Sequence, residues 1–271
     1  MSTPPSDLPP ANFGKAVILE PDWLSSFQGL WAMTWRRKLT VHSLLGLVIG
    51  MLALPTLAYF STEAGDEKVF YYWLINFYLQ VVAPLYCLAA FGDLIRDEVQ
   101  SDTLSFLVTR PVSRSKLFLL KFFAQMLFVQ IVLFLAMLLF NFVGILREIP
   151  GLGKLMPIFL GVQILSVLVY GALSSLFGLL ARKYLVLGIV YGFVVELGIA
   201  LIPTNINNLA MSRNLRTLLA NDETVKRLYS WSAGGTPLAI AILFFATVLF
   251  LSLGALLFTY REYHSAEEAQ K

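Results

Sequence analysis

Residues 117–145 read LFLLKFFAQMLFVQIVLFLAMLLFNFVGI, and Lys121 is the one charged side chain among them. A helix needs about 20 predominantly apolar residues to cross the hydrocarbon core of a bilayer, and this stretch is longer than that. Five other stretches have the same character. The pattern therefore predicts an all-α polytopic membrane protein with six transmembrane helices. The predicted spans are residues 41–60, 70–92, 117–145, 156–181, 184–203 and 237–260.

The composition of the whole chain fits this prediction. Of its 271 residues, 58% are hydrophobic and 14% are charged, whereas soluble domains have about 45–50% apolar and about 25% charged residues. Six spans leave too little chain for a fused soluble enzyme. The net charge of +3 is too small to indicate nucleic-acid binding, so we expect no nucleic-acid partner. The single cysteine, Cys87, permits no disulfide within the chain.

The two ends of the chain differ from its apolar middle. Residues 1–21 contain five prolines and no long apolar run, which predicts a disordered tail. Residues 22–40 place three tryptophans at helical spacing ahead of the basic cluster 36–38. Trp favours the membrane interface, and Lys and Arg favour the anionic cytoplasmic surface. This predicts an amphipathic interfacial helix, with a simple extension of the first span as the alternative. Residues 261–271 form a short polar tail.

Positive charges on the connections predict the orientation of the transmembrane domain, residues 41–260. Lys and Arg occur before the first span, in the connection 93–116, between the fourth and fifth spans, and after the last span. Because cytoplasmic connections are enriched in Lys and Arg, we expect these positions and both termini to be cytoplasmic. The segment 204–236 then lies outside although it carries four cations, which long translocated segments tolerate. Its interleaved leucines predict one or two amphipathic helices on the outer face.

The connection between the second and third spans is long enough to hold structure of its own. Residues 93–116 read DLIRDEVQSDTLSFLVTRPVSRSK. Either of the two polar residues at 101–102 can cap a short helix. Leu104 and Leu107 share one face of that helix, and Pro111 ends it. Such a helix suits docking into a groove on a soluble partner, although a helix that lies on the inner leaflet fits the pattern equally well.

At these residues the chain resembles the permease subunits of type-2 ABC exporters. Their connection between spans two and three carries a glutamate, then Gly-Thr-Leu, six variable residues, Pro-Val-Ser-Arg and a lysine at the head of the next span. The present chain keeps that spacing, except that Asp102 stands in place of the glycine. The matching residues are Glu98, Thr103, Leu104, Pro111, Val112, Ser113, Arg114 and Lys121.

The resemblance implies a permease subunit of an ABC exporter in the bacterial cytoplasmic (inner) membrane. Two separate ATPase subunits would bind ATP and Mg, and a second permease copy or homologue would complete the transporter. Membrane lipid and an extracytoplasmic protein are further partners that it implies. The residues expected to couple the permease to the ATPase are Glu98, Thr103, Leu104, Leu107, Pro111 and Arg114.

The chain itself is expected to be non-catalytic and to hold no cofactor or metal. A phosphate-binding G-x-x-x-x-G-K-[ST] run does not occur, since the sequence from Gly151 to Lys154 lacks the spacing and the hydroxyl residue. The two histidines, His42 and His264, stand apart from any cluster of cysteines and carboxylates that would indicate a zinc site.

Polar residues inside the predicted spans are candidates for a transport pathway. Glu196 lies near the middle of the fifth span, where a carboxylate is costly unless it is protonated, paired or hydrated. Asn76 and Gln80 lie one turn apart on the second span. These three are the candidate pathway residues. A hydrogen bond between neighbouring helices is the alternative for Glu196, and it is the favoured interpretation for the amides.

Two other classes of protein share some of these features. An ion-coupled secondary transporter also has several spans and a buried carboxylate, but it usually shows internal repeats, and no clear repeat is present here. An intramembrane hydrolase needs paired catalytic groups at one depth, whereas Glu196 is the one charged residue near the middle of a span. The permease subunit of an exporter is therefore the prediction.

Overall fold

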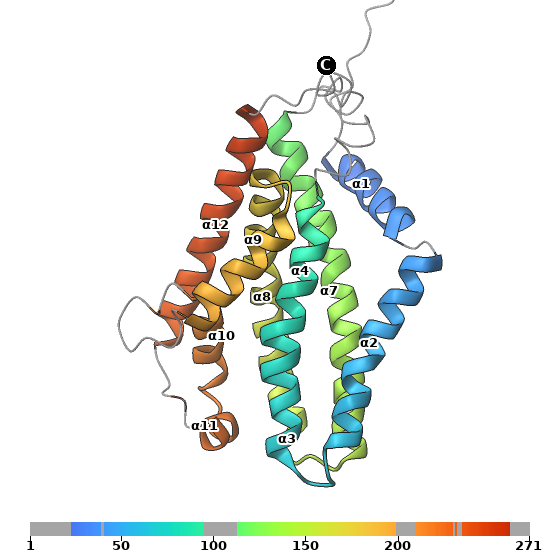
Figure 1. The fold of residues 1–271 in the computed structure, drawn as a ribbon, viewed down its shortest axis with the longest axis vertical. Coiled ribbons are helices and arrows are strands. Elements are labelled where there is room, and N and C mark those ends of the chain that lie inside the picture. Colours follow the sequence, from blue (N-terminus) through green and yellow to red (C-terminus); the bar gives the residue numbers. More distant parts are fainter. Residues whose placement is uncertain are drawn as a thin grey trace, which may run out of the picture.

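The computed structural model describes residues 23–38, 41–94, 113–198, 207, 210–229, 231 and 235–260, and every regular element among them is a helix. Figure 1 shows these helices as an elongated bundle. The predicted all-α class is confirmed for the part of the chain that the structure describes. The elements are α1 (Trp23–Lys38), α2 (Val41–Ser61), α3 (Glu67–Tyr72), η1 (Trp73–Val82), α4 (Ala83–Gly92), α7 (Arg114–Leu146), α8 (Leu152–Leu180), α9 (Tyr184–Tyr191), η2 (Gly192–Gly198), α10 (Met211–Leu219), α11 (Glu223–Tyr229) and α12 (Thr236–Tyr260).

Four of the six predicted spans are helices long and apolar enough to cross a membrane. The first and fifth predicted spans contain apolar helices that are shorter, Leu45–Ser61 and Tyr184–Glu196. Six spans therefore stay a prediction, while the membrane-spanning character of the chain is confirmed. The four long helices are Glu67–Gly92, Arg114–Leu146, Leu152–Leu180 and Thr236–Tyr260.

Several connections between helices lie at two opposite ends of the bundle, in the alternation that the sequence predicts. α1, the start of α7, the turn between α8 and α9, and the end of α12 lie toward the upper end in Figure 1. The turns that follow α2 and α7 lie at the lower end, together with α11. The upper end is the one predicted to be cytoplasmic, and that orientation stays a prediction.

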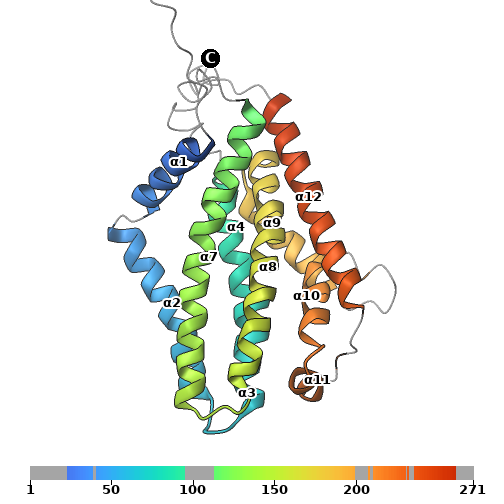
Figure 2. The same cartoon turned by 180° about the vertical axis from the view of Figure 1, so that it is seen from behind.

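α8 is the central helix of the bundle. It packs against α4, α7, α9, α10 and α12, and Figure 2 shows it between α7 and α12. On α8, Gln163 is fully buried, and its Oε1 accepts a hydrogen bond of 2.8 Å from the Tyr78 hydroxyl of η1. The interhelical hydrogen bond favoured for intramembrane amides is thus confirmed at Gln163.

The second span changes its helical form partway along. Residues 73–82 form the π-helix η1, in which backbone hydrogen bonds run over five residues, and α4 follows directly. Pro84 lies at the start of α4. Because proline has no N–H, an α-type hydrogen bond from residue 84 to the Gln80 carbonyl cannot form. This missing bond lies next to the switch from η1 to α4, and π-helical segments occur frequently at functional sites.

α1 packs across α7 near the end predicted to be cytoplasmic. The Trp35 ring meets Phe128 of α7 edge to face at 5.3 Å, and Trp31 meets Trp35 in the same geometry at 5.5 Å. Arg36 is exposed. A helix is therefore present where it was predicted, with Trp31 and Trp35 packed against the bundle, whereas its amphipathic, interfacial character stays a prediction.

Candidate functional site

Glu196 joins the fifth apolar helix to α10. Its Oε1 accepts hydrogen bonds from the Tyr191 hydroxyl at 3.0 Å and the Met211 N–H at 3.2 Å, and its Oε2 accepts from the Ser212 N–H at 2.8 Å. Met211 and Ser212 are the first two residues of α10. The first N–H groups of a helix lack an intrahelical acceptor and carry partial positive charge. A carboxylate at this position accepts their hydrogen bonds and interacts favourably with that charge. The side chain predicted to lie in mid-span thus caps a second helix.

Arg216 joins α10 to the second span. Its guanidinium donates a hydrogen bond to the Gln80 Oε1 of η1, and it lies 5.7 Å from the Trp231 ring. Burial lowers the pKa of Arg216, while the neighbouring Tyr170 and Glu196 oppose this change. The guanidinium stays protonated because its ordinary pKa exceeds about 12. α10 is therefore held by a carboxylate at one end and by a charged hydrogen bond further along.

A cavity of about 220 Å³ adjoins these contacts. It lies between the second span, α8 and the α9–η2 helix, and both Gln80 and Glu196 line it. Two of the three candidate pathway residues therefore meet at one cavity. Asn76 is half-buried one turn before Gln80 and does not line this cavity. The pathway role of all three stays a prediction.

A second, much smaller cavity of about 10 Å³ lies on the other side of Gln80, between the second span, α8 and α10. Gln80, Ser166 and Arg216 line it. Each of the three has a buried polar atom without a hydrogen-bond partner among the described residues: Gln80 Nε2, Ser166 Oγ and Arg216 Nε. The polar contacts around α10 are therefore incompletely paired.

The connection 93–116 begins at a tightly packed junction. Gly92, the last residue of α4, leaves no room for a side chain, because an added Cβ would overlap the Tyr184 ring. An added Cβ on Gly178 of α8 would overlap the carbonyl oxygen of Gly92. The backbones of α4 and α8 therefore touch where the connection begins.

Lys121 of α7 links the two helices that flank that connection. It is 8% exposed, and its Nζ donates a hydrogen bond of 3.4 Å to the carbonyl of Leu94, two residues after α4. Carbonyls at a helix C-terminus carry partial negative charge and favour a cation. The lysine of the matched motif thus fastens α7 to the end of the second span.

Most of the expected coupling residues lie outside the described residues, namely Glu98, Thr103, Leu104, Leu107 and Pro111. Arg114 is described: it is half-buried and begins α7, directly after the N-cap residue Ser113. α7 thus begins three residues before the predicted third span, residues 117–145. The docking role of the six residues stays a prediction.

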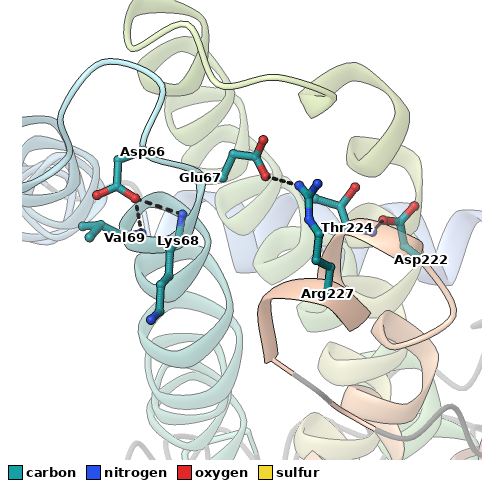
Figure 3. A network of polar contacts seen from close by, with 7 residues as sticks. All are labelled: Asp66, Glu67, Lys68, Val69, Asp222, Thr224 and Arg227. Carbon is teal, nitrogen blue, oxygen red and sulfur yellow. Dashed lines mark hydrogen bonds and ion pairs between the residues drawn. The ribbon is translucent and has the colours of Figure 1, made fainter.

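α11 is fastened to the end of the second span opposite Gly92. Arg227 Nη2 lies 2.8 Å from Glu67 Oε2, as Figure 3 shows. Asp66 caps α3 by accepting from the N–H groups of Lys68 and Val69 at 3.1 Å and 3.2 Å. Asp222 accepts from the N–H of Thr224 at 2.8 Å ahead of α11. The described part of the segment 204–236 contains two helices, α10 and α11, where the sequence predicted one or two, and each has a polar contact with the second span.

Sequence reasoning did not find the partners of Glu196. Tyr191 precedes Glu196 by five residues, a spacing that places two side chains together in a π-helix but not in an α-helix. Arg216 was recognised only as a cation that departs from the charge rule. Its contact with Gln80 spans 136 residues, and no local pattern predicts a contact of that range.

Long apolar helices around α8, a polar cluster at their centre and an adjoining cavity define an integral membrane protein of the transport class. The comparison with protein families sharpens this class, because the model of an ABC-2 family transporter protein matches residues 33–204. The chain belongs to the ABC-2 transporter family, as the motif of the connection 93–116 predicted, and is a membrane permease component of an ABC transporter. Membership implies association with ABC ATPase partners. The comparison with curated proteins gave no match.

Proposed function

We propose that the chain is the transmembrane subunit of an ABC exporter, driven by two separate ATPase subunits that bind ATP and Mg and completed by a second permease copy or homologue. The observation that carries the proposal is the course of the second span. This continuous 26-residue helix begins at Glu67, which forms the ion pair with α11. Its Gln80 accepts a hydrogen bond from Arg216, and it ends at Gly92, in the close contact with α8 where the connection 93–116 begins.

The second span is thus a mechanical link between the end predicted to be cytoplasmic and the polar cluster around α10. When the ATPase subunits close on the connection 93–116, the junction at Gly92 would pass the displacement to the second span, α7 and α8. Gln80 would then move relative to Arg216, and the cavity beside Glu196 would change shape. A transported molecule is moved only if the two states bind it with different affinity, and the cavity offers a place for that difference.

Docking of the ATPase is assigned to Glu98, Thr103, Leu104, Leu107, Pro111 and Arg114, and the pathway to Glu196, Asn76 and Gln80. The first set lies in or beside the longest connection at the end predicted to be cytoplasmic. For the second set, Gln80 and Glu196 share the 220 Å³ cavity, and Asn76 lies one turn from Gln80.

The docking role is tested by replacing Leu104 and Leu107 together with Asp. We expect the double variant to insert into the membrane normally but to lose the copurifying ATPase subunit and the permease-stimulated ATP hydrolysis. A matched control replaces Ser105 and Thr109 with Asp, which adds the same charge to the other face of the predicted helix. Unchanged hydrolysis in the Leu104/Leu107 variant, or transport by the permease alone, would overturn the proposal.

The orientation is tested with single cysteines, because Cys87, the one natural cysteine, is fully buried. Glu63 and Lys116 are both exposed, near opposite ends of the bundle. We expect a membrane-impermeant maleimide to label Glu63→Cys in intact cells and Lys116→Cys only after the membrane is opened. The reverse labelling would place the connection 93–116 outside and remove the ATPase from its proposed docking site.

A further inference from the structure

A small apolar cluster, separate from the main core, joins three spans near the end predicted to be cytoplasmic. It consists of Leu117 and Phe118 of α7, Leu179 of α8 and Phe258 of α12, each at most 7% exposed. Leu94 packs against this cluster. Because Leu94 lies at the start of the connection 93–116 and Leu117 follows its last residue, both ends of the connection meet the last span here.

α12 and the start of α7 are closely packed in this cluster. The rings of Phe118 and Phe258 are both buried, with their centroids 6.3 Å apart. A Cβ added to Gly254 of α12 would overlap the Phe118 ring. Figures 1 and 2 show the two helices side by side at this end of the bundle. The α12 backbone therefore touches a buried ring of α7, and close packing of this kind transmits a displacement.

A hydrogen bond between hydroxyl groups adds a directional contact. Ser115 Oγ and Thr259 Oγ1 lie 2.8 Å apart. Thr259 Oγ1 also donates to the Ala255 carbonyl at 2.8 Å. A hydroxyl group has one hydrogen to donate, so Ser115 is the donor of the bond between the two helices. Ser115 is the second residue of α7, and the end of the connection 93–116 is thus bonded directly to the last span.

The other half of α12 is fastened to α10. α12 is one α-helix from Thr236 to Tyr260, about 37 Å long at 1.5 Å per residue. Its Ala239 and Leu243 are buried in the main core with the leucines of α10, against which α12 packs. Asn221, two residues after α10, donates a hydrogen bond of 2.6 Å to Thr236 Oγ1. α12 therefore extends from the end of the connection 93–116 to α10.

We infer that α12 is a second transmission path from the connection 93–116 to α10, and that Ser115 and Thr259 are positioning residues that hold this path to α7. The second span leaves the beginning of the connection and reaches α10 through Gln80, whereas α12 is bonded to the end of the connection. α10 thus receives displacement from both ends. The inference rests on the proposed function for its driving force, the closure of the ATPase subunits.

The test uses the full permease in lipid nanodiscs, reconstituted with its ATPase subunit. A trifluoroethyl label on Thr217→Cys, a half-buried position of α10, reports on that helix. Cys87 is fully buried and stays unlabelled, and the permease is labelled before the ATPase subunit is added. We expect trapping of the closed ATPase with ADP and vanadate to produce a second ¹⁹F resonance.

Two results of this measurement are distinguishable. Failure of the ATPase subunit to bind the permease would overturn the proposed function, and the inference with it. A bound ATPase with stimulated hydrolysis but an unchanged ¹⁹F resonance would overturn the inference alone, because displacement would then not reach α10.

Two threonines on α12 provide matched variants. Thr259 accepts from Ser115 of α7, whereas Thr247 donates to the Leu243 carbonyl of its own helix. Thr259→Val keeps the shape and removes the hydroxyl, so the ratio of the second resonance to the first should fall about fivefold, the change that one neutral hydrogen bond can transmit. Thr247→Val should leave the ratio unchanged, and Thr259→Ser should retain it. Equal ratios in the two valine variants would contradict the role of Thr259.

A cross-link distinguishes joint motion from sliding of the two helices. Ser115→Cys and Thr259→Cys, joined by a short bis-methanethiosulfonate reagent, cannot separate. Because the inference requires α7 and α12 to move together at this point, we expect the cross-linked protein to hydrolyse ATP at the same stimulated rate as the protein after reduction. If the cross-link abolishes stimulation and a reductant restores it, the two helices must part during the cycle and the inference is wrong.

Discussion

The second span meets its neighbours in two different ways along its length. At Gly92 its backbone touches that of α8, and neither Gly92 nor Gly178 has room for a Cβ. At Gln80 it contacts α10 through a hydrogen bond, with a cavity on either side and unpaired polar atoms nearby. Close-packed backbones are nearly incompressible and transmit a displacement, whereas hydrogen bonds beside free volume can exchange partners. The contrast assigns transmission to the junction and rearrangement to the polar cluster.

The largest expected effect comes from breaking the junction. Gly178→Ala places a methyl group on the Gly92 carbonyl oxygen, and because that atom is backbone, the two helices must separate. Overpacking costs about 1–3 kcal/mol and occasionally more. Because the overlapped atom cannot rotate away, we expect the upper end of that range, which leaves about 2 kcal/mol after the roughly 1 kcal/mol that alanine gains over glycine within a helix. We expect the thermal unfolding midpoint and the stimulated ATP hydrolysis to fall together.

The matched control for the junction is Gly161→Ala on the same helix. An added Cβ there meets nothing within 4 Å, so we expect the unfolding midpoint to stay unchanged or rise. A second arm uses Gly92→Ala, whose added Cβ overlaps the Tyr184 ring. Tyr184→Ala should recover part of the loss in the double variant, because contacting sites are not additive. Additive losses would show that the two residues do not form one junction.

The next effect is expected at the polar cluster. Arg216→Met removes the charged donor to the part-buried Gln80 Oε1, which water beside it can partly replace, so we expect a loss of about 1.5 kcal/mol, the lower end for a hydrogen bond to a charged group. Arg216→Lys keeps the charge but loses the planar guanidinium group. Its stability should therefore lie between that of Arg216→Met and that of the natural protein. Because free volume adjoins this site, we expect a smaller loss of stability than at Gly178. A larger loss than Gly178→Ala would reverse the comparison.

A smaller effect is expected at Glu196. Glu196→Gln retains the shape but replaces one accepting oxygen by an NH₂ group, which cannot accept from the N–H groups of α10. Loss of a helix cap of this kind costs about 1 kcal/mol. The unfolding midpoint should therefore fall modestly, while Glu63→Gln at an exposed position should have no effect. If Glu196→Gln changes transport and leaves stability intact, the side chain acts in the pathway rather than as a cap.

The sequence predicted what depends on local pattern and missed what depends on distant contacts. Four spans followed from apolar runs of sufficient length, because hydropathy is a property of neighbouring residues. Glu196 was recognised as unusual from its place in an apolar run. Its acceptance of the Ser212 N–H, and the contact of Gln80 with Arg216, required the chain to return over 16 and 136 residues. The close approach of Gly92 and Gly178 joins residues 86 positions apart in the chain, so it shows only when both helices are in place.

The smallest effect is expected at the far end of the second span. Arg227 and Glu67 form an ion pair whose side chains are 68% and 20% exposed, and exposed pairs of this kind contribute about 0–1 kcal/mol. α11 is held in addition by Val225, which is fully buried. Arg227→Ala should therefore lower the unfolding midpoint only slightly, and high salt should remove the difference from the natural protein. Lys226→Ala, at an exposed position beside it, is the control. A loss at Arg227 as large as that at Gly178 would mean that the tie to α11, rather than the junction at Gly92, determines how the second span is held.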